Sequence, residues 1–177
     1  MSNAATPLGD PGPPGLAGLP PAMDSRRDFI TALHGSVQSA VAHGARRMLW
    51  ADRDFAEWPL DDPALLERTS QWLRRPRRHL VLLAHNFDDM SRRCPRFVAW
   101  YRTWSHGVSA LSPPRGDGAE LPCLLLVEGT AAVHVADKER WRGRISLDLT
   151  EVKQWWDRTD ALMQRSDPAF PATTLGL

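Results

Sequence analysis

The sequence lacks several features that would assign it to a class of protein. No stretch of 18 or more apolar residues is present, so no membrane span is predicted, and no basic region with an apolar run after it marks a secretory signal. The two cysteines lie in unlike surroundings, which argues against a disulfide framework. Neither a Gly-rich phosphate loop nor an internal repeat occurs. We therefore expect a cytoplasmic protein with no membrane segment.

An excess of charge of one sign is also missing. Twenty-two Lys and Arg residues against 21 Asp and Glu leave a net charge of +1, so the overall field gives no reason to expect a polyanionic partner. Lysine is scarce, because Lys138 and Lys153 are the only two and the other cations are arginine. Together with abundant Ala and Pro, this composition is typical of a GC-rich bacterial genome. Because the net charge is close to zero, any function that needs positive charge must rest on a local cluster.

The length and composition suit one domain with a buried core, since 42% of the 177 residues are hydrophobic and eight are Trp. Residues 1–23 hold six prolines and four glycines, which cannot sustain a helix or a strand ladder, so a disordered tail is predicted there. A Pro-rich docking peptide is the alternative for this tail. We expect a single α/β domain over residues 24–170, followed by a short tail over 171–177.

Hydrophobic periodicity predicts alternating helices and strands. Helices are expected over 25–43, 62–73, 89–105 and 150–167, the third interrupted at Pro95, and strands over 46–55, 79–84, 106–111 and 145–149. The stretch HLVLLA at 79–84 is apolar throughout, as expected of a strand covered on both faces. This order predicts a mixed, mostly parallel β-sheet flanked by helices on both faces. An Arg-Gly-Asp triplet lies in the loop expected over 112–120, and a cytoplasmic protein would not use it for adhesion.

The rest of the predicted fold is organised around Leu121–Val135, whose sequence is LPCLLLVEGTAAVHV. Two apolar runs flank a Glu-Gly-Thr turn, and an acidic residue followed by Gly between apolar runs is a short-range hairpin signal. A buried β-hairpin is therefore predicted.

Polar side chains follow two of the predicted strands. Asp52 and Asp54 end the first strand, and His85 and Asn86 follow the second. The carboxyl ends of strands are where open α/β sheets bind ligands. With His134 and Asp148 as further candidates, these groups could form a cleft for acid–base or metal chemistry, although they come from separate elements and no spacing demands it. Loop solvation and helix capping are the structural alternative, and no metal or cofactor is predicted.

A basic cluster, Arg74, Arg75, Arg77 and Arg78, ends the second predicted helix. Clustered arginines suit phosphate contacts, so this segment, with Arg46 or Arg47, is a candidate for binding nucleic acid. Cations are also favoured at a helix C-terminus, where they meet the negative end of the helix dipole. No aromatic residues are interleaved with these arginines, which favours the second explanation.

The order of elements over residues 24–167 resembles one half of the phospholipase D superfamily. In that family the first arm of a hairpin carries His, any residue, Lys, four residues and then Asp, usually with Gly after it. Laid on this chain, Leu121 takes the place of the His, Cys123 that of the Lys and Glu128 that of the Asp, while Gly129 matches the turn glycine.

This resemblance implies the family's frame without its reaction. In the family the imidazole attacks phosphorus and the Lys holds phosphate oxygens, and neither a leucine nor an apolar-flanked thiol can do this. The family's Gly-Ser step is occupied by Val135 and Ala136. Because active members combine two halves, a single half implies a homodimer.

Three functions follow as hypotheses. The first is a non-catalytic phospholipase D-like domain that acts as a binding or regulatory module and has no phosphodiesterase activity. The second is a nucleic-acid-binding protein that uses the arginine cluster, because inactive relatives of nucleases often keep a binding face. The third is a hydrolase whose site lies at the strand ends around Asp52, Asp54 and His85.

Overall fold

The computed structural model describes residues 15–114 and 120–170. Its elements, in chain order, are η1 (Leu16–Gly18), β1 (Ala22–Met23), α1 (Arg26–Ala42), β2 (Arg47–Ala51), α2 (Pro63–Leu73), β3 (His79–Leu83), α3 (Met90–Arg93), α4 (Pro95–Thr103), β4 (Val108–Ser112), β5 (Cys123–Val127), β6 (Ala131–Asp137), β7 (Arg142–Ser146), α5 (Leu149–Met163) and β8 (Asp167–Pro168). The Arg-Gly-Asp triplet and the tail over 171–177 lie outside the described residues. No described helix is both long and apolar enough to cross a membrane.

The strands form one open eight-stranded sheet in the order β1-β7-β6-β5-β2-β3-β4-β8. The mixed α/β class is confirmed, but the expectation of a mostly parallel sheet is wrong. Among the described strands, β2 pairs parallel with β3 and β3 with β4, and the other neighbours are antiparallel. The reason is local, because the hairpin and the short connection to β7 return the chain at once, and parallel pairing needs a crossover of about a dozen residues or more.

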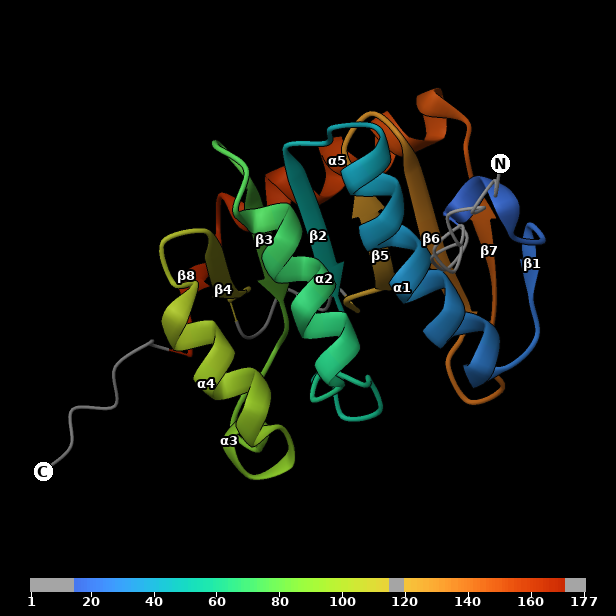
Figure 1. The fold of residues 1–177 in the computed structure, drawn as a ribbon. Helices are drawn as coiled ribbons and strands as arrows, with labels where there is room; N and C mark the ends of the chain where they lie inside the picture. Colours follow the sequence, from blue (N-terminus) through green and yellow to red (C-terminus); the bar gives the residue numbers. More distant parts are fainter. Residues whose placement is uncertain (1–14, 115–119, 171–177) are drawn as a thin grey trace, which may run out of the picture.

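Helices cover both faces of the sheet, as predicted. In Figure 1, α1, α2 and α4 lie in front of the sheet and α5 crosses behind it. The front layer holds the larger core, with Phe29, Trp50 and Trp72 fully buried. Behind the sheet, the α5 side chains Val152 and Trp156 close a second, smaller core.

The helices α1, α2 and α5 each begin at a side chain that caps them. The Ser25 hydroxyl accepts a hydrogen bond from the backbone N–H of Asp28, and the Asp62 carboxylate accepts one from Ala64 N–H. Asp148 caps α5 by accepting from the N–H groups of Thr150 and Glu151. These caps satisfy backbone donors that have no partner within the helix. Asp148 therefore has a structural role and does not belong to a cleft at the strand ends.

The disorder predicted for residues 1–23 does not hold for residues 15–23. Leu16 is 1% exposed, its N–H donates to the Ser39 hydroxyl, and Met23 in β1 is 2% exposed beside β7. The prolines and glycines exclude a long element, but they leave apolar side chains that the core buries. Residues 1–14 lie outside the described residues.

The hairpin confirms the prediction for Leu121–Val135. All five residues of β5 are buried, and β5 pairs with β2 on one side and β6 on the other. Gly129 has a φ of +62° at the turn, a conformation that glycine adopts without steric cost. The hairpin thus forms the middle of the sheet.

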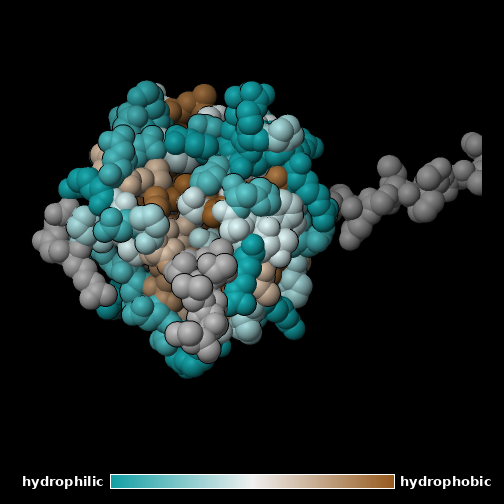
Figure 2. All heavy atoms as spheres, turned by 90° about the vertical axis from the view of Figure 1, so that its left-hand side faces the viewer, coloured by the Kyte–Doolittle hydropathy of each residue, from teal (hydrophilic) through white to brown (hydrophobic). Residues whose placement is uncertain are grey.

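Hydrophobic side chains reach the surface where α5 leaves the rear face of the sheet partly covered. Leu111, Leu121, Leu162 and Met163 pack against the smaller core and are only partly buried. Figure 2, which views the molecule from the side of β4, shows hydrophobic atoms at the surface among hydrophilic ones.

Replacing Gly143 by Ala should destabilise the protein by about 3 kcal/mol, because a Cβ there would overlap the His134 carbonyl oxygen and lie 2.8 Å from Val135 Cα. Gly44→Ala is the matched control, since Gly44 has a φ of +67° but nothing within 4 Å, so only backbone strain of about 1 kcal/mol is expected. Urea denaturation measures both. Equal losses would show that β6 and β7 are not packed this closely.

Candidate functional site

A buried ion pair occupies the end of β2. Asp52 is 3% exposed, and its Oδ1 accepts a hydrogen bond from Lys138 Nζ at 2.7 Å. Its Oδ2 accepts from the Phe55 N–H at 3.0 Å, so both carboxylate oxygens have partners. A buried carboxylate is tolerated when it is paired and hydrogen-bonded in this way. Asp52 therefore connects the loop after β2 to the segment after β6.

The thiol of Cys123 lies beside this pair. In the antiparallel β2–β5 ladder Ala51 faces Leu124, which brings Cys123 next to Asp52. Burial raises the pKa of the Cys123 thiol to about 12, with Asp52 adding to the rise and Lys138 opposing it. The Lys138 ammonium also lies 4.7 Å from the centre of the Trp141 ring. Cys123 is thus a protonated, buried thiol next to a cation that Asp52 neutralises.

The three positions that stand for the family's catalytic residues do not form one site. Leu121 packs with the core behind the sheet, whereas Cys123 packs with the core in front of it. Glu128 lies beyond the other end of β5, where its carboxylate accepts from Arg47 Nε at 3.0 Å. These three side chains therefore lie in different surroundings.

The predicted cleft residues do not all line one pocket, although the ends of β2 and β3 lie side by side and the His85 N–H donates to the Arg53 carbonyl oxygen. His85 and Asn86 line a pocket of about 290 Å³ at the ends of β3 and β4, with Asp88, Asp167 and Phe170 among its other lining residues. Neither Asp52 nor Asp54 lines it. Asp54 turns its own carboxylate to the Ala56 N–H, and its carbonyl oxygen accepts from Arg93.

His134 lies on β6, where it pairs with Leu124, and its side chain packs against α5. Its ring is 4.8 Å from the Trp155 ring of α5, and burial, together with the nearby Arg144, lowers the pKa of the imidazole. Of the predicted cleft residues Asp52, Asp54, His85, Asn86 and His134, only His85 and Asn86 line the pocket at the ends of β3 and β4. Among the described residues, no group of three or more His, Cys, Asp or Glu side chains is placed to hold a metal ion.

The arginine cluster lies at the opposite edge of the sheet, where β2, β3 and β4 begin. We call this surface the basic edge; it consists of Arg46, Arg74, Arg75, Arg77, Arg78, Trp104 and His106. Backbone hydrogen bonds join its segments, because the His79 N–H donates to the Arg46 carbonyl oxygen and the Leu80 N–H donates to the Gly107 carbonyl oxygen. The Trp104 and His106 rings lie 5.6 Å apart in the turn before β4.

Charge on the basic edge is only partly compensated. Arg74 pairs with Glu67 at 3.7 Å, while Arg46, Arg75 and Arg77 are exposed and form no ion pair with any described residue. Burial lowers the pKa of neighbouring His79, so this imidazole adds no charge at neutral pH. The edge is a local concentration of cations on a chain with a net charge of +1.

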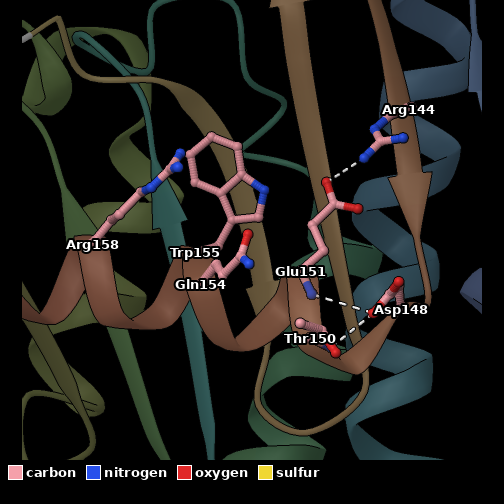
Figure 3. Close-up of a pocket in the computed structure, with 7 residues that line it drawn as sticks. All are labelled: Arg144, Asp148, Thr150, Glu151, Gln154, Trp155 and Arg158. Atoms are coloured by element: carbon pink, nitrogen blue, oxygen red, sulfur yellow. Dashed lines mark hydrogen bonds and ion pairs between the residues drawn. The ribbon is translucent and has the colours of Figure 1, made fainter.

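A second pocket, of about 410 Å³, lies beside α5. Arg144, Asp148, Thr150, Glu151, Gln154, Trp155 and Arg158 line it. Figure 3 shows the Trp155 indole between Arg158 and the ion pair of Arg144 with Glu151.

No protein-family model matches the sequence, and none of the curated proteins matches it either. Among solved structures, NucT from Helicobacter pylori, which has the phospholipase D-like fold, superposes with a TM-score of 0.55 at 8% identity, over 81% of this chain and 92% of NucT. A likeness at this identity shows the fold alone.

The archaeal chromatin protein TrmBL2, whose structure shows a novel mode of DNA binding, superposes with a TM-score of 0.49 at 11% identity. The match covers 77% of this chain and 52% of TrmBL2, so the chain spans about half the length of that protein.

Sequence reasoning missed two features of these surfaces. The sequence does not predict Lys138 beside Cys123. The rarity of lysine is the one signal for a special role of Lys138, since the chain has 20 Arg and two Lys and a compact ammonium does not replace a planar guanidinium. The aromatic pair Trp104 and His106 was not assigned to the arginine cluster, because the two segments lie far apart along the chain.

Lys138→Met should lower the free energy of unfolding by about 2 kcal/mol, because it leaves the Asp52 carboxylate buried without its cation. The double variant Asp52→Asn with Lys138→Met should recover most of this loss, since the amide oxygen of the new asparagine can still accept from Phe55 N–H. Lys153→Met, which removes an exposed pair with Asp157, should cost less than about 0.5 kcal/mol. Urea denaturation measures the three variants, and losses of the same size for both lysines would contradict the buried pair.

Native Cys123 should resist iodoacetamide near pH 8, because a pKa of about 12 leaves only about one thiol in 10,000 ionised. Cys94 should resist too, since burial raises the pKa of its thiol. In the unfolded chain both thiols ionise near their ordinary pKa. The unfolded state therefore binds fewer protons above about pH 9, and stability should fall as pH rises from there towards 12. Mass spectrometry of native and denatured protein checks the labelling, and rapid modification of native Cys123 would contradict its burial.

Proposed function

We propose that this protein binds nucleic acid through the basic edge and does not hydrolyse it. The observation that carries the proposal is the pairing of β3 with β4, which brings the turn with Trp104 and His106 against the arginine segment. A Cβ atom added at Gly107 would lie 3.6 Å from the Arg78 carbonyl oxygen, so the two segments are in contact. A surface that carries both exposed cations and partly exposed aromatic rings suits the binding of a phosphate backbone and its bases.

Stabilisation of a helix end does not account for the whole cluster. Arg74 is the C-cap of α2, and its charge there is favourable beside the helix dipole. Arg77 and Arg78 lie beyond the helix in the connection to β3, and Arg46 comes from a different connection. Separate connections that converge on one positive surface favour a polyanionic partner.

The non-catalytic part of the proposal rests on what occupies the positions of the family's reactive groups. Leucine and a protonated thiol stand there, and the nearby Lys138 is neutralised by Asp52. A strand-end hydrolase is not favoured, because Asp52 has both oxygens occupied and Asp54 does not line the pocket of His85. A homodimer stays a prediction that light scattering can test.

Arg75→Gln with Arg77→Gln should weaken binding to a short DNA duplex about tenfold at low salt and reduce the slope of log affinity against log salt by about 2, because two phosphate contacts are lost. Fluorescence anisotropy over a salt series measures both quantities. The charge-matched control is Arg140→Gln with Arg142→Gln, which lies at the other end of the sheet.

Equal weakening by both double variants would reduce the interaction to unspecific charge, and absence of binding at low salt would refute the proposal. The DNA should be recovered intact after long incubation. Cleavage by the purified protein would overturn the non-catalytic part alone.

A further inference from the structure

The pocket beside α5 is a separate surface with chemistry of its own. It lies on the rear face of the sheet, between α5 and β7, and its volume of about 410 Å³ is within the range of small-molecule sites. The residues of the basic edge do not line it. Its function therefore has to be argued from its own side chains.

Both carboxylates of the pocket are already engaged. Asp148 accepts from two backbone N–H groups at the start of α5. Glu151 accepts from the Ser146 hydroxyl at 2.6 Å and from Arg144, and these bonds lower the pKa of its carboxyl group. Neither group is left to attract a cation.

Arg158 is the cation without such a partner. Its side chain is exposed, and no carboxylate of the described residues lies within ion-pair distance. Its guanidinium carbon is 5.4 Å from the centre of the Trp155 ring, so it lies at an aromatic surface with donors to spare. An anion is the complementary ligand.

Trp155 provides a flat apolar wall next to that cation. Its indole packs on the His134 ring at 4.8 Å and remains partly exposed. Because burial lowers the pKa of His134, this support is an uncharged ring at neutral pH. In Figure 3 the indole stands between the two arginines that line the pocket.

We propose that the α5 pocket binds one nucleotide unit, with its aromatic ring against Trp155 and its phosphate on Arg158. Stacking on an aromatic side chain and a charge-assisted bond to a guanidinium are the two interactions that such a unit needs. The unit can come from a free mononucleotide or from an unpaired nucleotide of a single strand. This site does not depend on the basic edge.

Isothermal titration of the full chain with adenosine monophosphate, and separately with a short single strand of deoxyadenosine, tests the proposal. Arg158→Gln should weaken binding of the probe about tenfold, and Trp155→Leu should weaken it by a similar factor. Lys153→Gln is the matched control, since it removes a cation from α5 outside the pocket and should leave binding unchanged.

The outcomes separate the two sources and the two surfaces. Binding of both probes indicates a free nucleotide site, and binding of the strand alone indicates an unpaired nucleotide of a polymer. Wild-type affinity in Arg158→Gln, or no binding of either probe at millimolar concentration, would overturn the proposal. The Arg75→Gln, Arg77→Gln variant should bind adenosine monophosphate normally, so a failure of the basic edge leaves this result intact.

Discussion

The antiparallel ladder between β2 and β5 is the constraint on which the rest of the structure depends. It joins the parallel strands β2, β3 and β4 to the antiparallel strands β5, β6 and β7 within one sheet. Both strands are almost completely buried, so a slip of one residue would exchange the two cores. The ladder thereby fixes which groups meet at each end of the sheet.

At one end the ladder places Cys123 beside Asp52, and Lys138 completes a buried, neutralised cluster. At the other end it places Glu128 beside Arg47, whose guanidinium also bonds Asp160 and lies 4.4 Å from the Trp156 ring. Both clusters hold the sheet to its flanking segments. The bonding capacity of these polar groups is taken up within the fold, and the two proposed binding sites use surface residues instead.

The two proposed binding surfaces combine the same types of side chain. On the basic edge and in the α5 pocket, arginines without carboxylate partners share a surface with aromatic rings, and burial lowers the pKa of His79 and of His134 next to them. The low content of lysine means that nearly all cationic contacts are planar guanidinium contacts, which can stack and bond bidentately. A chain with almost no net charge can in this way offer local sites for anions.

Local pattern determined much of this fold from the sequence alone. The apolar run at 79–84, the break at Pro95 and the Glu-Gly turn of the hairpin each specify structure through residues that are neighbours in the chain. The mismatch with the hairpin motif of the phospholipase D superfamily also follows from residue types, because Leu121 and Cys123 cannot supply an imidazole or an ammonium group.

Tertiary structure decided the rest. Burial of Leu16 and Met23 in the core, the Asp52–Lys138 pair and the contact of the Gly107 turn with Arg78 all depend on residues far apart in sequence. Strand order and register set such contacts, and a one-dimensional pattern does not encode which strands become neighbours.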